Sequence, residues 1–169
     1  MESDILYEEV QFFAKKSVQD LFKIITGLLI LGSAVSLFIK PQEQTEIVNS
    51  LLAGVLICGF VSFVLAKAKL ITQVRANGIY VRFPPLQNRF VVCTWDAMDT
   101  VFIRNYNSLQ EFGGWGIRFG PNGTVYNVSG NIGIQIVFKD GNRLLIGTND
   151  PEQLGDILLR MGRLDYQNT

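Results

Sequence analysis

A run of twenty uncharged residues, Ile47 to Ala66, constrains this chain more than any other stretch of its sequence. As a helix it would be about 30 Å long, which is the thickness of the hydrocarbon core of a bilayer. Sixteen uncharged residues also lie between Lys23 and Lys40. This run is long enough to cross the membrane if Leu21 and Phe22 are part of the helix and the side chains of Lys23 and Lys40 extend toward the aqueous phase. We therefore predict a transmembrane helical hairpin over residues 23–66, with spans at about 21–39 and 47–66.

Two alternative interpretations of these apolar runs fit less well. A cleaved signal peptide begins with a short basic segment, whereas the first 23 residues carry five acidic and three basic side chains. A soluble bundle does not need two uninterrupted apolar runs in 169 residues. The outer flanks are basic, so the positive-inside rule predicts that both termini are cytoplasmic. The flanking basic residues are Lys15, Lys16, Lys23, Lys67, Lys69 and Arg75.

Small residues recur four apart in the second run: Ser50, Gly54, Cys58, Ser62 and Ala66. Such residues let helix backbones approach closely in lipid. They fit packing against the first span within the hairpin, which we favour because any hairpin needs an internal seam. They also fit contact with another membrane protein or formation of a homo-oligomer.

The segment before the first span shows helical spacing of its apolar residues. Leu6, Val10 and Phe13 recur at intervals of three and four, next to Glu8 and Glu9. We expect an amphipathic helix over residues 1–22, lying at the cytoplasmic interface of the membrane.

Residues 67–169 show the pattern of a β domain. Val74, Ile79, Val81 and Phe83 alternate with polar residues around the turn pair Asn77–Gly78. This alternation predicts a hairpin with those apolar residues in the core and with Arg75, Tyr80 and Arg82 on the opposite face. Further short strands follow between glycine-rich turns, about eight in total. We expect an antiparallel β-sandwich or barrel.

A single helix is predicted at the end of this domain, over residues 151–162. Asp150 is a helix N-cap, Pro151 occupies the first turn, and Gly162 suits the C-terminal cap. The apolar stripe consists of Leu154, Ile157, Leu158 and Met161. The predicted fold class is thus membrane-anchored α+β, a helical hairpin followed by a β domain that the last helix closes.

Five stretches carry a resemblance to a known family: LYEEVQFF, NGIYVRFPP, EFGGWGIRFG, YNVSGNIGIQI and LLIGTNDPEQL. With a tryptophan-containing bend at TWDAMDTV and the terminal helix, they resemble an uncharacterised family of small bacterial membrane proteins. Those proteins combine a two-helix transmembrane hairpin with a bacterial pleckstrin-homology-like (PH-like) domain of about seven strands. The resemblance implies a multi-pass protein of the bacterial inner membrane, and it carries over no catalytic residue.

Composition argues against most catalysis and against nucleic-acid binding. The chain has no histidine, the commonest general base and metal ligand, and its two cysteines show no metal-binding spacing. Fifteen basic and fifteen acidic residues balance, whereas nucleic-acid binding needs a basic surface. We predict neither an enzyme nor a metal or cofactor site.

The stretch EFGGWGIRFG, residues 111–120, looks like a phosphate-binding loop but lacks the required spacing and a following helix. We interpret Gly113–Gly114 as a turn and the rest as a strand. Trp115, Ile117 and Phe119 would then share a core face. On the other face, Gly116 leaves room beside Arg118 for a contact.

Two binding functions follow from these patterns, and we rank a protein-interaction or assembly module at the membrane first. The second is binding of an anionic lipid headgroup or small ligand through Arg75, Arg82 and Arg89. An enzyme ranks last. The residues proposed to contact a lipid or partner are Arg75, Tyr80, Arg82, Arg89, Gly116 and Arg118.

Overall fold

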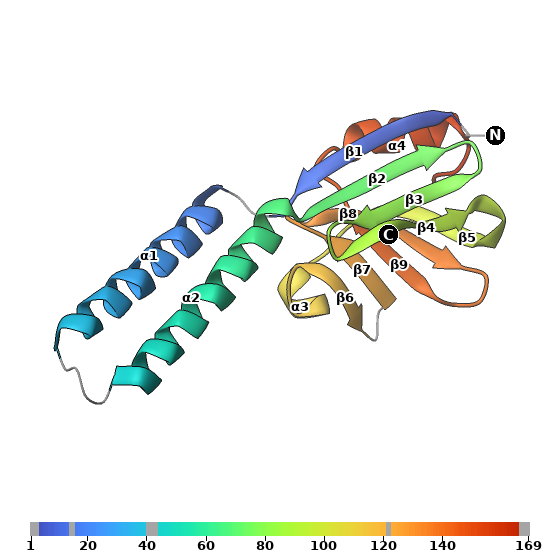
Figure 1. Ribbon diagram of the computed structural model, residues 1–169. Coiled ribbons are helices and arrows are strands. Elements are labelled where there is room, and N and C mark those ends of the chain that lie inside the picture. The colour runs from blue at the N-terminus through green and yellow to red at the C-terminus, as the bar shows by residue number, and fades with distance from the viewer. Residues whose placement is uncertain (1–3, 14–15, 40–43, 121–122, 166–169) are drawn as a thin grey trace. The chain divides into compact units, whose positions relative to one another are not determined.

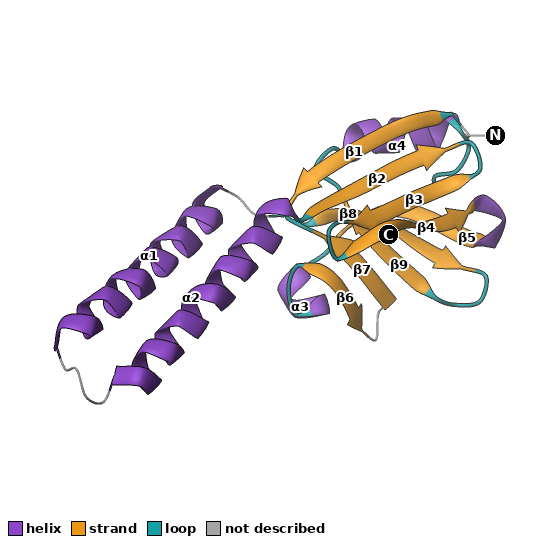
Figure 2. Ribbon diagram, viewed as in Figure 1, coloured by secondary structure: helices purple, strands orange, loops and turns teal. Residues whose placement is uncertain are grey.

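The computed structural model describes residues 4–13, 16–39, 44–120 and 123–165 (Figure 1). The chain forms two compact units. One comprises Ala14–Ala68 and is helical, and the other comprises Met1–Phe13 together with Lys69–Thr169 and is built mainly of strands (Figure 2). The fold is therefore α+β, as predicted.

The helical unit consists of α1 (Lys16–Ile39) and α2 (Gln44–Lys67). A side-chain atom placed on Gly54 of α2 would lie 3.8 Å from Leu29 Cδ1 of α1, so the two helices approach each other there. Cys58 and Ser62 lie on the same partly covered face of α2, and the Ser62 hydroxyl donates to the Cys58 carbonyl at 2.7 Å. Gly54 therefore lies at the contact between the two helices, Cys58 and Ser62 are partly buried on the same side of α2, and Ser50 and Ala66 are exposed.

Among the described residues, one helical segment is long and apolar enough to cross a membrane. It is Asn49–Lys67, with a mean hydropathy of 2.1. The apolar stretch of α1, Lys23–Gly32, is shorter. The structure thus has two helices where two were expected, and the transmembrane hairpin itself stays a prediction.

Residues 5–12 form a strand, β1 (Ile5–Phe12), so the amphipathic helix predicted over residues 1–22 is wrong there. The next described helix is α1. In the strand, Tyr7, Glu9 and Gln11 point inward while the apolar Leu6 and Val10 are exposed. Two inward side chains bond to distant residues, which sequence spacing does not reveal. Gln11 Nε2 donates to the Gly147 carbonyl at 2.7 Å, and Glu9 accepts from Thr148 Oγ1 at 2.7 Å and from the Asn149 amide at 2.8 Å.

The first sheet is antiparallel, in the order β1-β2-β3-β4, where the later strands are β2 (Lys69–Arg75), β3 (Gly78–Phe83) and β4 (Gln87–Thr94). The β2–β3 turn lies at residues 76–77, one position before the predicted pair, so that Val74 pairs with Ile79. A turn at residues 77–78 would pair Val74 with Val81 instead, so the partners in β3 are shifted by two residues. A shift of two residues keeps the same side chains on the same face of the sheet. The predicted core face of Val74, Ile79, Val81 and Phe83 is therefore confirmed by their burial.

The second sheet has five strands in the order β5-β8-β9-β7-β6. Their bounds are β5 (Met98–Asn105), β6 (Gly116–Gly120), β7 (Gly123–Asn127), β8 (Ile132–Phe138) and β9 (Arg143–Gly147). The eight predicted strands after residue 69 are thus present among the described residues. The expectation of a purely antiparallel arrangement is wrong, because β7 and β9 pair in parallel. Their chain directions agree because β8 reverses the chain between them.

A short helix, α3 (Ser108–Phe112), precedes the turn predicted at Gly113–Gly114. Asn107 Oδ1 accepts from the amides of Leu109 and Gln110, each at 3.1 Å, and caps the helix. Gly113 and Gly114 follow with φ of 71° and 136°, which confirms the turn predicted there.

The last helix, α4 (Pro151–Arg160), begins where predicted and ends two residues earlier than expected. Asp150 Oδ1 accepts from the Gln153 amide at 3.1 Å, and Gly162 has a φ of 64°, so both predicted caps are confirmed. Leu154 and Leu158 are buried. This helix completes the core of the β unit.

The core side of α4 can be tested with two adjacent leucines. Leu158 is 0% exposed and Leu159 is 42% exposed. We expect Leu158→Ala to lower the free energy of unfolding by about 2–5 kcal/mol, because it leaves a cavity, and Leu159→Ala to lower it by less than about 1 kcal/mol. Urea unfolding of the full chain in detergent, followed by tryptophan fluorescence, measures both. Equal losses would contradict this packing.

Candidate binding face

The outer face of the first sheet carries three of the six predicted site residues. Strand alternation places Arg75, Tyr80 and Arg82 on the side opposite the buried Val74, Ile79 and Val81. Register then adds neighbours from the flanking strands: Gln73 pairs with Tyr80, and Tyr80 pairs with Val92 of the edge strand β4. Phe90, two residues before Val92, joins the same face.

Five of these residues contact one another, and we call Gln73, Arg75, Tyr80, Arg82 and Phe90 the arginine–aromatic cluster. The Arg75 guanidinium carbon lies 4.5 Å from the Tyr80 ring centroid, and that of Arg82 lies 4.5 Å from the Phe90 centroid. The two rings meet edge to face at 6.0 Å. Arg75 also donates from Nε and Nη2 to Gln73 Oε1, at 3.1 and 2.6 Å. Stacking therefore holds both arginines on the sheet surface, and hydrogen bonds to Gln73 add to it for Arg75.

Neither arginine of the cluster has a carboxylate partner in the part of the chain that the structure describes. The ion pairs there are Asp20–Lys23 and Arg104–Glu111. The cluster thus presents two positive charges and two aromatic rings, next to the exposed Val92. Such a surface can bind a carboxylate or phosphate together with an apolar group.

The other three predicted residues lie elsewhere. Arg89 precedes Phe90, so alternation directs it away from the cluster, and it is exposed on the edge strand. Gly116 and Arg118 belong to β6 of the second sheet. Gly116 is buried, and a side-chain atom on it would lie 3.8 Å from the Phe13 ring. The gap predicted beside Gly116 is therefore already occupied by Phe13.

The predicted core face of β6 is also wrong. Trp115 and Phe119 are 42% and 80% exposed, and Ile117 is only partly buried. Arg118 Nε donates to the Trp115 carbonyl at 3.1 Å. Alternation alone could not tell which face of this edge strand is covered, because Phe13, which covers Gly116, is far away in the sequence.

Sequence reasoning missed two members of the cluster, Gln73 and Phe90. For Phe90 a sequence signal existed. The signal was present in RFVVC, where Phe90 and Val92 alternate with Arg89 and Val91. Only the register of β3 with β4 shows that Phe90 shares a face with Arg82.

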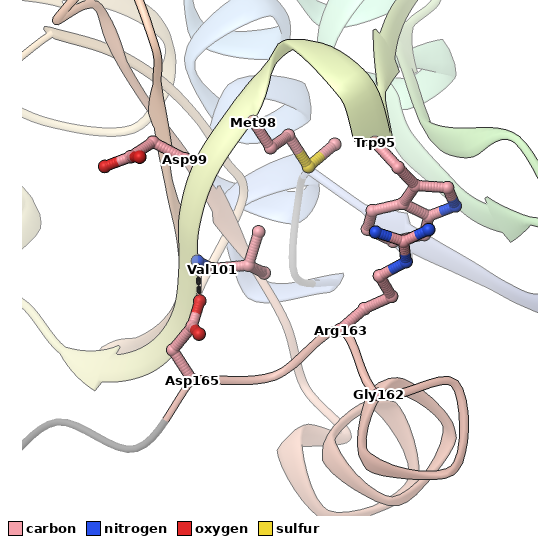
Figure 3. Close-up of a pocket in the computed structure, with 7 residues that line it drawn as sticks. All are labelled: Trp95, Met98, Asp99, Val101, Gly162, Arg163 and Asp165. Atoms are coloured by element: carbon pink, nitrogen blue, oxygen red, sulfur yellow. Dashed lines mark hydrogen bonds between the residues drawn. The ribbon is translucent and has the colours of Figure 1, made fainter.

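A small cavity in the second sheet is a separate candidate site (Figure 3). Its volume is about 120 Å³, and it is lined by Trp95, Met98, Asp99, Val101, Gly162, Arg163 and Asp165. Asp165 Oδ2 accepts from the Val101 amide at 2.7 Å, and Arg163 lies over the Trp95 ring at 5.4 Å. These contacts attach the segment after α4 to β5. The volume is below that of a site for a drug-sized ligand, roughly 300–1,000 Å³.

Two titratable groups of the β unit, Glu111 and Cys93, have shifted pKa values with structural causes. Arg104 Nη2 contacts Glu111 Oε2 at 2.8 Å, and this hydrogen bond lowers the pKa of Glu111. The pair connects β5 to α3. Burial raises the pKa of the Cys93 thiol to about 11, so this thiol is neutral and unreactive at pH 7. Within the described residues, no group of three or more His, Cys, Asp or Glu could hold a metal ion.

No protein-family model and no curated protein matches this sequence. The function must therefore be argued from the surfaces of the molecule.

The stacking within the cluster can be measured with a double-mutant cycle on Arg82→Ala and Phe90→Ala. We expect a coupling of about 0.5–1 kcal/mol in the free energy of unfolding, because the guanidinium lies over the ring. The control cycle pairs Arg89→Ala with Phe90→Ala, whose side chains leave opposite faces, and should give a coupling near zero. Equal coupling in both cycles would contradict the face assignment.

Proposed function

We propose that this protein is a non-enzymatic, membrane-anchored PH-like module whose arginine–aromatic cluster binds another protein at the cytoplasmic face of a bacterial inner membrane. The observation that carries this proposal is the cluster itself: two arginines and two aromatic rings gathered on the outer face of the first sheet, with no carboxylate paired to either arginine among the described residues.

The strand order supports the PH-like part of the proposal. Without the β6–β7 hairpin, the β unit has four strands in one sheet and the antiparallel set β5-β8-β9 in the other. Those seven strands and α4 match in number the strands and terminal helix on which the resemblance rests, although β1 lies before the helices and outside the domain predicted over residues 67–169. The β6–β7 hairpin would then be an addition at the edge.

The surface of the helical unit supports the membrane anchor. Leu56, Phe60 and Phe63 of α2 are exposed, as are Leu28 and Leu31 of α1. Large apolar side chains on the outer faces of two paired helices need a covering, which a bilayer supplies. Because basic residues precede α1 and follow α2, the anchor would leave both termini in the cytoplasm.

The composition of the cluster favours a protein partner. Arginine, tyrosine and phenylalanine are enriched at protein interfaces, where a few such residues contribute most of the binding energy. Exposed Leu6, Val10 and Val92 flank the cluster on the edge strands and would form the apolar surround. The two stacked guanidiniums would pair with carboxylates of the partner.

Binding of an anionic lipid headgroup is the second candidate, because the same guanidiniums match a phosphate. Distance along β2 weighs against it for Arg75 but not for Arg82, which pairs with Ile71, two residues from Lys69. Arg75 lies six residues beyond Lys69, where the strand leaves the helical segment, and six residues of strand span about 20 Å. That is more than two Debye lengths at physiological salt, so the surface potential of the protein's own membrane would be largely screened at Arg75.

The proposal predicts a partner that depends on charge. Purification of the full chain from its native membrane in mild detergent should recover a stoichiometric protein. Arg75→Glu with Arg82→Glu should reduce the recovered partner by at least about tenfold, because both charges are reversed at the centre of the face.

The matched control is Arg143→Glu with Arg160→Glu, two exposed arginines on β9 and α4. This variant should retain the partner. Recovery of the wild-type chain alone would overturn the interaction function. A cluster variant that loses binding to vesicles containing phosphatidylglycerol, with no protein recovered from the wild type, would establish the lipid function in its place.

The anchor is tested by placing charge in the middle of α2. Leu56→Arg with Phe60→Arg should cost about 2.5–3.5 kcal/mol per residue on insertion and release the chain from membranes in alkaline carbonate. Leu6→Arg with Leu159→Arg, at exposed positions of the β unit, should leave the chain membrane-bound. Release of the wild-type chain by carbonate would contradict an integral anchor.

A further inference from the structure

The β unit exposes a set of large apolar side chains that the arginine–aromatic cluster does not use: Phe12, Leu86, Leu109, Trp115 and Phe119. We propose that this set, the apolar rim, inserts into the headgroup region of the bilayer and fixes the orientation of the β unit on the membrane. The inference rests on the proposed membrane anchor, and it concerns a surface distinct from the partner-binding cluster.

Two members of the rim lie at the same end of the first sheet. Phe12, the last residue of β1, pairs with Lys69, the first residue of β2. The Lys69 amide donates to the Pro84 carbonyl at 3.0 Å, which brings the β3–β4 turn and its Leu86 to this end. Phe12 and Leu86 are 67% and 66% exposed.

The second sheet contributes the remaining members beside this end. Phe13 covers Gly116 of β6, and the Tyr126 hydroxyl of β7 donates to Gln87 Oε1 at 2.8 Å. These contacts place the β6–β7 hairpin next to the β3–β4 turn. Phe119 of that hairpin and Trp115 just before it are exposed, as is Leu109 of α3. Helix α3 lies against β6 (Figure 1).

The side chains of the rim are strongly exposed for their size. Leu109 and Phe119 are 61% and 80% exposed, and Trp115 is 42% exposed. Every phenylalanine or tryptophan exposed in the described part of the β unit belongs to the rim. Tryptophan and phenylalanine are favoured at the boundary between headgroups and acyl chains.

The short connections between the helices and the first sheet indicate that the bilayer, and not another protein, contacts the apolar rim. Phe12 is four residues before Lys16, where α1 begins, and Lys69 is two residues after Lys67, where α2 ends. Four residues span at most about 14 Å. Once α1 and α2 are inserted, this end of the sheet cannot move far from the membrane surface. The rim is thus confined to the neighbourhood of lipid, whereas the far end with Arg75 is about 20 Å further along the strands.

The two tryptophans of the chain make a direct test available. Trp115 belongs to the rim, and Trp95 is 6% exposed in the core. The full chain is reconstituted into vesicles of phosphatidylcholine and phosphatidylglycerol, with and without acyl chains brominated near the headgroup. The fluorescence due to Trp115 is the difference in emission between the wild-type chain and Trp115→Phe. We expect this difference to be about twofold smaller in brominated vesicles, because interfacial side chains reach about 5–10 Å into this region. The emission of Trp95 should not change.

Substitutions elsewhere in the rim provide a second test. Leu86→Ser with Phe119→Ser should weaken the quenching of Trp115 by bromine, and Leu6→Ser with Leu159→Ser, at exposed positions outside the rim, should not. A Trp115 that brominated lipid does not quench in a carbonate-resistant chain overturns the rim and leaves the anchor standing. Shielding of Trp115 from aqueous acrylamide without bromine quenching also overturns it, because a protein would then cover the rim. Release of the chain by carbonate overturns anchor and rim together.

Discussion

The pairing of β1 with β2 is the interaction on which the rest of the molecule depends. These strands lie on either side of both helices in the sequence, yet they pair along seven register positions from Ile5 opposite Arg75 to Phe12 opposite Lys69. The pairing closes the helical segment as a loop of the β unit, at an entropic cost that grows only slowly with loop length. It also brings the entry to α1 and the exit from α2 to neighbouring strands.

The partners of β1 explain why that closure is specific. Its inward side chains are largely polar, and Glu9 and Gln11 bond to Gly147, Thr148 and Asn149 at the end of β9. Buried polar groups that lack partners are costly, so a slip of one residue would expose these groups and bury Leu6 and Val10 in their place. The strand is therefore held in register by hydrogen bonds to the far end of the chain.

The β unit that forms when β1 pairs with β2 carries two surfaces with different chemistry. Exposed aromatic and aliphatic side chains on β1, the β3–β4 turn, α3 and β6 make up the proposed apolar rim. On the outer face of the first sheet, stacked arginines and rings form the arginine–aromatic cluster. Under the proposed anchor, one surface meets lipid while the other remains available to a partner.

The sequence by itself determined the local features: the apolar helices, the strands after residue 69, the face shared by Arg75, Tyr80 and Arg82, and both caps of α4. Each depends on periodicity or on residues within a few positions, which can be read without knowing the fold. Only the tertiary structure decided that residues 5–12 form a strand, that β7 pairs in parallel with β9, that Phe90 joins the cluster and that Trp115 and Phe119 face outward. The physical reason is common to all four, since each outcome depends on which distant strand covers a face or satisfies a polar group.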